Sequence, residues 1–415
     1  MLPEELPQPT PLPVDRGTSV SHWLASHGLV ATQPNIRSSD FGLIRQCPFL
    51  YYLIRRLSLV PAISTSPALS QGTWFHKRAS LTGSPPETVT MRMHKLLSES
   101  NHSIQLFAKS VGLSRTQADE LLAEEANNFH LGWALFEASS TLEISPRIGT
   151  LTNFLSAPHI KILGHELKLA LLESQQKGLV ARRPLVAEVD ILLFDSRTEQ
   201  LWVLDFKTTS HYTTTRLQTC PIEDQTVHYS HIVRSLLPII IETYSLPSTT
   251  KFGGMCHVAI QKPKLFLSGL DRDYTEEPHT LKSGPRKGQI EIRRTYRGEP
   301  LFSNYLRRCT RWLKGESEYL DLKPERNTHP PINISWTPSS MTDQSSPIWK
   351  EYRTKLAFVS SYATIDPVPE RFPRCVEGMT DSHGKLSVYA HFYLTDPKYW
   401  PSIVEDQNLL IRPRD

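Results

Sequence analysis

The stretch VAEVDILLFD at residues 186–195, followed by LWVLDFKTT at residues 201–209, decides the fold of this chain. Both runs are rich in Val, Leu, Ile, Phe and Trp, which predicts two adjacent, largely buried strands joined by a short polar loop. If the loop spans residues 196–199, antiparallel pairing sets Asp190 directly opposite Asp205. Lys207 lies two residues beyond Asp205 and therefore projects from the same face of the sheet.

Two opposed carboxylates in a buried sheet need an explanation. Like charges directly across a strand pair destabilise the sheet, and buried charges are costly without partners. A divalent cation between Asp190 and Asp205 would offset that repulsion, and Lys207 beside it completes a group suited to phosphodiester hydrolysis. The alternative is an ordinary hairpin whose scattered acids and single lysine are solvated.

Composition sets wide bounds on the function. The chain has 415 residues, a net charge of +4 and a pI of about 8.7, which permits a nucleic-acid partner without requiring one. No apolar run is long enough to span a membrane, and the proline-rich segment 1–17 predicts a flexible leader and not a signal peptide. The five cysteines are scattered without a CxxC pair, which favours free thiols and a cytoplasmic protein. They are Cys47, Cys220, Cys256, Cys309 and Cys375.

Further elements are predicted on both sides of the two strands. Additional strands are expected from residue 160 to about 172 and over 253–260. Helices are expected over 18–30, over 37–56 with a break at Pro48, from about residue 71, through 88–139, and over 221–244, 301–320 and 345–360. The segment 104–122 has a helix-turn-helix pattern with Gly112 at the turn, although apolar spacing of this kind more often reflects core packing.

Short motifs flank the two strands in a definite order. Along the chain these are Cys47-Pro48 followed by Tyr51-Tyr52, then Gly72 and His76, Glu166 on the predicted strand before the hairpin, Asp190 with Asp205 and Lys207, and finally Gln225 and Tyr229. In this order the motifs resemble those of the PD-(D/E)XK nuclease superfamily, specifically its RecB-like branch of viral, cellular and CRISPR-associated exonucleases. The resemblance covers roughly residues 37–262 as separate motifs.

The resemblance implies an α/β fold, a restriction-endonuclease-like core in which helices flank a mixed central β-sheet. A helical insertion and irregular N- and C-terminal extensions would surround this core. The expected organisation is a leader over 1–17, a helical segment with the first two motifs over 18–87, the insertion over 88–150, the nuclease core over 151–262, a basic segment and helix over 263–325, and a proline-rich extension over 326–415.

The resemblance also implies roles for individual residues. Asp190, Asp205, Lys207 and Glu166 would be catalytic. Mg²⁺ or Mn²⁺ would be held by Asp190 and Asp205 with the Phe206 carbonyl and His76, since hard oxygen ligands suit Mg²⁺. Gln225 and Tyr229 are four residues apart, so on a helix they share one face and could contact DNA. His76 and the Gln225–Tyr229 pair also have structural explanations that involve no ligand. A lone helical histidine is often structural, and a Gln–Tyr pair often lies on an ordinary exposed face.

Two departures from the family pattern stand out. Relatives often carry glycine where this chain has Glu188, which by the same pairing would face Lys207 as an added ligand, a partner of the lysine, or a sign of altered activity. Many relatives bind an iron–sulfur cluster through the Cys47 position and three later cysteines. Only Cys375 is available near the C-terminus, so no cluster is expected. A weak zinc site of Cys375, His383 and His391 is conceivable.

The expected function is therefore metal-dependent DNA cleavage, as an exonuclease in DNA replication, recombination or repair in the cytoplasm of a bacterium or phage-infected cell. DNA is the expected partner, a recombinase or single-strand-binding protein is a further candidate, and no membrane is involved. Basic side chains between 282 and 314 could contact the DNA backbone. The alternatives are a catalytically impaired DNA-binding or assembly subunit with the same fold, and a metal-dependent phosphatase.

Overall fold

The computed structural model divides the chain into two compact units, described separately below. The smaller comprises Met1–Asn35, Asp40–Ala62 and Phe358–Asp415, and the larger Ile36–Ser39 and Ile63–Ala357. The structure describes residues 34–61, 67–110, 113–145, 148–172, 183–210, 212–262, 274–280, 289–296, 302–314, 331–364, 389, 392 and 409–411. The predicted helix over 18–30, the side chains of Cys375, His383 and His391, and most of the basic segment lie outside these residues.

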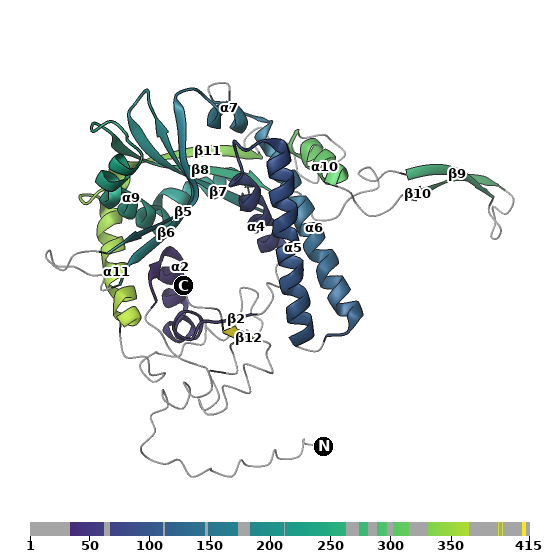
Figure 1. Cartoon of the computed structure of the whole chain (residues 1–415), viewed down its shortest axis with the longest axis horizontal. Coiled ribbons are helices and arrows are strands. Elements are labelled where there is room, and N and C mark those ends of the chain that lie inside the picture. Colours follow the sequence, from purple (N-terminus) through teal and green to yellow (C-terminus); the bar gives the residue numbers. More distant parts are fainter. Residues whose placement is uncertain are drawn as a thin grey trace, which may run out of the picture. The chain divides into compact units, whose positions relative to one another are not determined.

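A mixed six-stranded sheet forms the core of the larger unit (Figure 1). Strands β6 (Leu185–Asp195) and β7 (Gln200–Thr209) are the predicted antiparallel pair, joined through residues 196–199. β8 (Lys251–Gln261) runs parallel to β7 and pairs with the antiparallel β11 (Ile332–Pro338). On β6, β5 (Ile160–Leu171) is antiparallel and the short β1 (Ile36–Arg37) is parallel. The predicted strands near 160 and 253 are thus confirmed.

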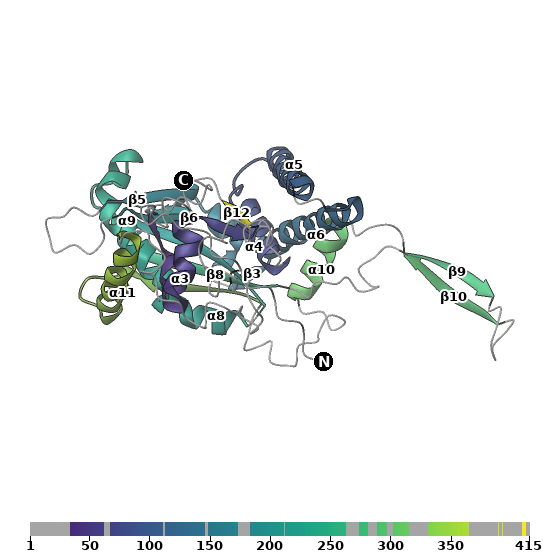
Figure 2. The same cartoon turned by 90° about the horizontal axis from the view of Figure 1, so that it is seen from below.

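Helices cover both faces of this sheet, because its central strands are apolar on both sides (Figures 1 and 2). One face packs against α4 (Pro67–Ala79), α6 (Arg115–Ser140) and α10 (Phe302–Lys314). The other face packs against α9 (Asp224–Thr243). His228 of α9 donates from Nε2 to the Val186 carbonyl, and its Nδ1 accepts from the Tyr352 hydroxyl of α11 (Pro347–Thr364). Helices around a mixed sheet confirm the predicted α/β class with a restriction-endonuclease-like core.

The segment expected to form a helical insertion contains two long helices, α5 (Pro86–Ser110) and α6, which lie side by side in both views. A capping box starts α6, in which the Ser114 side chain accepts from the Gln117 N–H and the Gln117 side chain accepts from the Ser114 N–H. Further along α6, Gly132 lies where α6 crosses α4, and a Cβ added at Gly132 would be only 2.6 Å from the Gln71 carbonyl oxygen. The absence of a side chain at Gly132 therefore sets how closely the two helices approach.

Strands β6 and β7 pair only over residues 191–195 of β6 and lie apart over its first half, and this fork positions the site described below. Their ladder runs from Asp195↔Gln200 to Ile191↔Leu204. β5 occupies the other edge of β6 along its whole length. Because a strand has only two edges, β1 must pair with residues 185–186 on the edge that β7 has left. Residues 187–190 therefore border an opening between β6 and β7.

Several elements differ from the sequence-based expectation. β11 was not predicted, because prolines at 330, 331 and 338 bracket a short run of mixed polarity and favour irregular structure. The helix expected over 301–320 is described only for 302–314. A separate hairpin of β9 (Tyr274–Thr280) and β10 (Ile290–Tyr296) falls within the basic segment. The shorter elements are β3 (Glu143–Ser145), β4 (Gly149–Thr150), α7 (Leu151–Leu155), α8 (Thr213–Thr219), η3 (Cys220–Ile222) and η7 (Ser339–Thr342).

The smaller unit contains the first motif of the sequence. α2 (Ser38–Gln46) leads into it, and α3 (Pro48–Tyr51) begins with proline at its first position, continuing as the π-helical turn η1 (Tyr52–Arg56). Arg56 is fully buried and donates to the Tyr362 carbonyl over 2.7 Å. A two-stranded ladder of β2 (Leu59–Pro61) and β12 (Leu409–Ile411) completes the described part. The buried Cys47 thus ends one helix and precedes the next.

Two expectations from composition can be compared with the described residues. Cys47, Cys220, Cys256 and Cys309 are buried and free of disulfides, and Cys375 lies outside the described part. Among the described helices, none combines the length and apolar character needed to cross a lipid bilayer.

Candidate active site

A row of ionisable side chains crosses four neighbouring strands at the fork. The β5–β6 register places Glu166 opposite Asp190, between the pairs His165↔Ile191 and Leu167↔Val189. The β6–β7 ladder ends at Ile191↔Leu204, and Asp190 and Asp205 are the next residues of the two strands, at the point where the strands separate. Asp205 in turn is the partner of His257 on β8. The sheet therefore brings two acids of the predicted centre to one level, with a third acid and a histidine at the ends of the row.

Asp190 is held by contacts from two directions. Its Oδ1 lies 3.1 Å from His76 Nδ1 of α4, and its Oδ2 accepts from the Phe206 backbone N–H over 2.7 Å. The second bond exists because the fork removes a backbone partner from that N–H. In a strand the N–H and C=O of one residue point to the same edge, so the Phe206 carbonyl also faces the opening.

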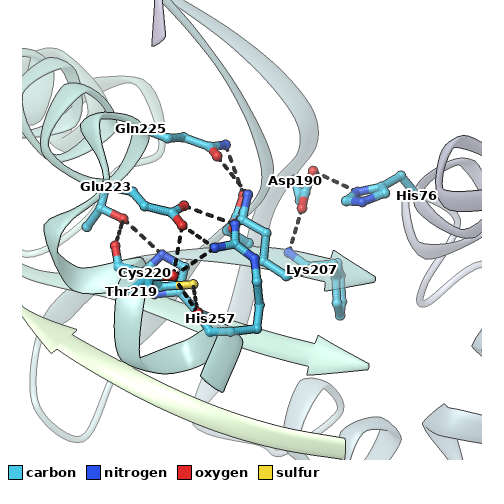
Figure 3. A network of polar contacts seen from close by, with 12 residues as sticks. His76, Asp190, Lys207, Thr219, Cys220, Glu223, Gln225 and His257 are labelled. Atoms are coloured by element: carbon cyan, nitrogen blue, oxygen red, sulfur yellow. Dashed lines mark hydrogen bonds and ion pairs between the residues drawn. The ribbon is translucent and has the colours of Figure 1, made fainter. Parts of the chain in front are cut away.

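Asp205 and Lys207 form an ion pair beside this carboxylate. Figure 3 shows the contact between His76 and Asp190, and Lys207 and Gln225 in the same group of polar side chains. The Lys207 ammonium lies 2.8 Å from Asp205 Oδ2 and donates over 2.7 Å to Gln225 Oε1, and Gln225 Nε2 donates to Asp205 Oδ1 over 3.2 Å. Asp205 is only 3% exposed. Burial acts to lower the pKa of Lys207, but the charge and hydrogen bond of Asp205, together with the charges of Asp190 and Glu223, outweigh it and the net shift is upward. The lysine is therefore held in its charged form.

His76 responds to the same acids. Burial acts to lower the pKa of its imidazole, while the neighbouring Asp190 carboxylate raises it through its charge and hydrogen bond, and the net shift is upward. α4 reaches this position because Gly72, one turn before His76, lies against β7. A Cβ at Gly72 would be 3.1 Å from the Thr208 hydroxyl. The glycine and the histidine of the second motif thus act together, one allowing the approach and the other making the contact.

Glu166 has an uncommon backbone conformation at the end of the row. Its φ of +44° lies in the left-handed region that side chains other than glycine rarely adopt. Its side chain is exposed, and the pKa of its carboxyl is raised by partial burial and by the charges of Glu188 and Asp190. The predicted third acid is therefore close enough to sense the other carboxylates.

Gln225 and Tyr229 both lie on α9 and face the centre. Besides its contacts with the ion pair, Gln225 is hydrogen-bonded to the Tyr229 side chain. Tyr229 is 7% exposed, and burial together with the Asp205 charge raises the pKa of its hydroxyl. The last motif, Gln225 and Tyr229, thus supports the acid–lysine pair directly, which the sequence alone did not predict.

The expectation that Glu188 faces Lys207 is wrong. The β6–β7 ladder ends at Ile191↔Leu204, so the arithmetic of the hairpin no longer applies at Glu188. Its register partner is instead Lys168 on β5, and its side chain is exposed. Cys47 belongs to the smaller unit, where its side chain is fully buried.

Other polar residues near the centre were missed from the sequence. Arg216 of α8 forms a bidentate pair with Glu223. Partial burial acts to raise the pKa of the Glu223 carboxyl, but Arg216 and the Lys207 charge lower it overall. The buried His257 donates from Nε2 to the Thr226 hydroxyl over 3.1 Å, since that hydroxyl itself donates to the Cys220 carbonyl. These residues come from separate segments that show no common motif, so only the packing of α8 and α9 on the sheet reveals them.

The donor set at the fork suits a hard divalent cation. Within the described residues, no three Asp, Glu, His or Cys side chains gather closely enough to hold a metal by themselves. Mg²⁺ does not need such a cage, because it is usually bound by one or two carboxylates while it retains water and takes substrate phosphate oxygens. Asp190 and Asp205, with the nearby Phe206 carbonyl, offer this kind of oxygen-rich, incomplete shell.

Comparison with known proteins gives one match. A family model described as the PD-(D/E)XK nuclease superfamily matches residues 39–271, more than half of the chain. Searches of curated proteins and of solved structures returned no match. The matched range contains every residue of the row across the sheet and both helices that contact it.

Proposed function

Because this chain belongs to the PD-(D/E)XK nuclease superfamily, we propose that it is a metal-dependent deoxyribonuclease, acting as an exonuclease in DNA replication, recombination or repair. The observation that carries the proposal is the convergence of Asp190, Asp205 and Lys207 at the fork between β6 and β7. Members of this superfamily are typically nucleases that use Mg²⁺ or Mn²⁺. The proposed setting is the cytoplasm of a bacterium or of a phage-infected cell.

In this proposal Asp190 and Asp205 hold the cation, with the Phe206 carbonyl as a further ligand. When bound, the cation polarises the phosphate and lowers the pKa of a water molecule. His76 keeps the Asp190 carboxylate in position, and the Phe206 N–H fixes its other oxygen. A carboxylate restrained on both oxygens needs little reorganisation when a cation binds.

Lys207 would supply the positive charge of the centre. Its ammonium is charged and restrained between Asp205 and Gln225, so it can neutralise charge that develops on the phosphate. Gln225 and Tyr229 would face the DNA strand from α9, with an amide for hydrogen bonding and an aromatic ring for stacking. Glu166 is proposed as a further acid that orients water or a second cation.

The proposal is tested by incubating the purified chain with linear, nicked-circular and closed-circular DNA and with single-stranded DNA, in Mg²⁺, Mn²⁺ or EDTA. We expect cleavage of linear DNA with either cation and none in EDTA. Resistance of closed circles would identify an exonuclease. Metal-dependent DNA binding without cleavage would instead support the impaired, assembly-subunit alternative, and hydrolysis of mononucleotides alone would indicate a phosphatase.

Replacing His76 by alanine is expected to lower kcat/KM for DNA cleavage about 10- to 100-fold, as is typical when the partner of a metal ligand is removed. The loss should shrink as the Mg²⁺ concentration rises, because Asp190 keeps its oxygens but loses its orientation. A cleavage assay over a range of Mg²⁺ concentrations measures this. His102→Ala, an exposed histidine on α5, is the matched control and should leave the activity unchanged. If His76→Ala and His102→Ala cleave DNA equally well, His76 has no role in the active site.

A further inference from the structure

A pocket lies beside the row of carboxylates, and apart from Gln225 and Tyr229 its lining residues have no role in the chemistry described above. Its volume is about 450 Å³. It is lined by Arg37, Ser38, Ser39, Lys168, Val186, Glu188, Gln225 and Tyr229, which come from β1, the start of α2, β5, β6 and α9. All of these residues belong to the larger unit.

The pocket and the candidate active site share a wall. Gln225 lines the pocket and also contacts both Asp205 and Lys207. Glu188 lies two residues before Asp190 on β6, a separation of about 6.6 Å along the strand, and side chains so spaced share a face. A ligand in the pocket would therefore lie next to a phosphate held at the fork.

Hydrogen-bond donors and positive charge dominate the lining. Arg37 contributes a half-buried guanidinium and Lys168 an exposed ammonium. The serines at the start of α2 and the phenol of Tyr229 add hydroxyl groups. One carboxylate, Glu188, stands across from Lys168 in the β5–β6 register, so two cationic side chains face a single anion. Arginine, lysine and hydroxyl groups converging in this way suit a phosphate group.

We propose that this pocket binds a phosphate of the DNA strand that is being cleaved, one or two nucleotides from the scissile phosphate. The inference rests on the proposed function and extends it. Lys168 and Arg37 supply the attraction, and Glu188 limits it, so that the strand can move on after each cleavage. The pocket thereby fixes the register of the strand on the enzyme while Asp190 and Asp205 act on the neighbouring phosphate.

The test compares three single variants of the full chain in DNA binding, measured in EDTA by fluorescence anisotropy as a function of salt. Lys168→Ala should weaken DNA binding about fivefold. It should also lower the slope of log affinity against log salt concentration by about one, as expected for the loss of one phosphate contact. Glu188→Gln should tighten binding, because it removes the negative charge. Lys161→Ala removes another exposed lysine of β5, which pairs with Phe194 outside the pocket, and should change neither quantity.

A neutral methylphosphonate, moved one position at a time along the strand, identifies the contacted phosphate. In wild-type protein one position should weaken binding most, and Lys168→Ala should abolish the effect at that position alone. Competition by inorganic phosphate with no position-dependent effect would show a site for the free anion and overturn the strand assignment. Equal effects of Lys168→Ala and Lys161→Ala, or weaker binding by Glu188→Gln, would overturn the pocket altogether.

Failure of this inference can be told apart from failure of the proposed function. The binding measurements need no cleavage, so a position-specific loss in Lys168→Ala would stand even if the chain proved to be a non-catalytic DNA-binding subunit. Conversely, Mg²⁺-dependent cleavage by the wild-type protein with unchanged DNA binding in Lys168→Ala would support the nuclease function and overturn the phosphate-binding pocket.

Discussion

Replacing Asp190 by asparagine is expected to lower the rate of DNA cleavage at least about 1,000-fold, because the variant loses the carboxylate that is proposed to hold the cation at the fork between β6 and β7. The fold should survive. Asparagine keeps an oxygen for the Phe206 N–H, and its neutral amide relieves repulsion from Asp205 and Glu166. Single-turnover cleavage of linear DNA, together with thermal unfolding of the same samples, measures both effects.

Asp195→Asn provides the matched control for this loss. Asp195 lies on the same strand as Asp190, at the turn into β7, where it accepts from the Arg197 N–H and forms an ion pair with the exposed Arg197 side chain. Its substitution should leave cleavage within about twofold, since surface ion pairs contribute little. Substantial cleavage by Asp190→Asn, comparable to that of Asp195→Asn, would assign the activity to another site or to a contaminating nuclease.

Gly132→Ala is expected to destabilise the larger unit by about 3 kcal/mol, although alanine is the better helix former. An added Cβ would lie 2.6 Å from the Gln71 carbonyl oxygen and 2.7 Å from the Trp74 Cβ, and both are part of α4. The two helices would have to separate at their closest approach. Because α4 also carries His76, cleavage should fall together with stability. Urea unfolding followed by circular dichroism measures the change in free energy.

Gly42→Ala is the opposite case within another helix. Gly42 lies in α2, and nothing lies within 4 Å of the position where a Cβ would be. This substitution should therefore stabilise the protein by up to about 1 kcal/mol through helix propensity alone. If both alanine variants shift the unfolding midpoint in the same direction, close packing of α4 on α6 is not what selects glycine at position 132.

Local pattern carried the prediction of the central hairpin. The loop length was enough to predict the register of β6 against β7 as far as Ile191↔Leu204, because hairpin register follows from turn length. The alternation of β7 likewise puts Asp205 and Lys207 on one face of that strand. The same arithmetic failed at Glu188. Strand separation depends on β1 taking the place of β7, and β1 lies some 150 residues earlier in the chain, beyond the reach of any local pattern.

Long-range packing also explains what else was missed. β11 reads as irregular because prolines flank it, yet it gains a full ladder from β8. Lys168 lies two residues after Glu166. Because side chains two apart on a strand share a face, the sequence could have placed both on one face of β5. The binding role proposed for Lys168 follows only from the strand register, which sets Lys168 across from Glu188 and beside residues of α9.

The fork also gives the protein an internal spectroscopic probe. The Phe206 amide proton is bound by a carboxylate that is itself a candidate cation ligand, and not by a neighbouring strand. Any change in the charge carried by Asp190 must alter the electron density around that proton. A Mg²⁺ titration followed by amide NMR should therefore move the Phe206 resonance further than those of Leu201 to Leu204, whose positions lie within the intact ladder.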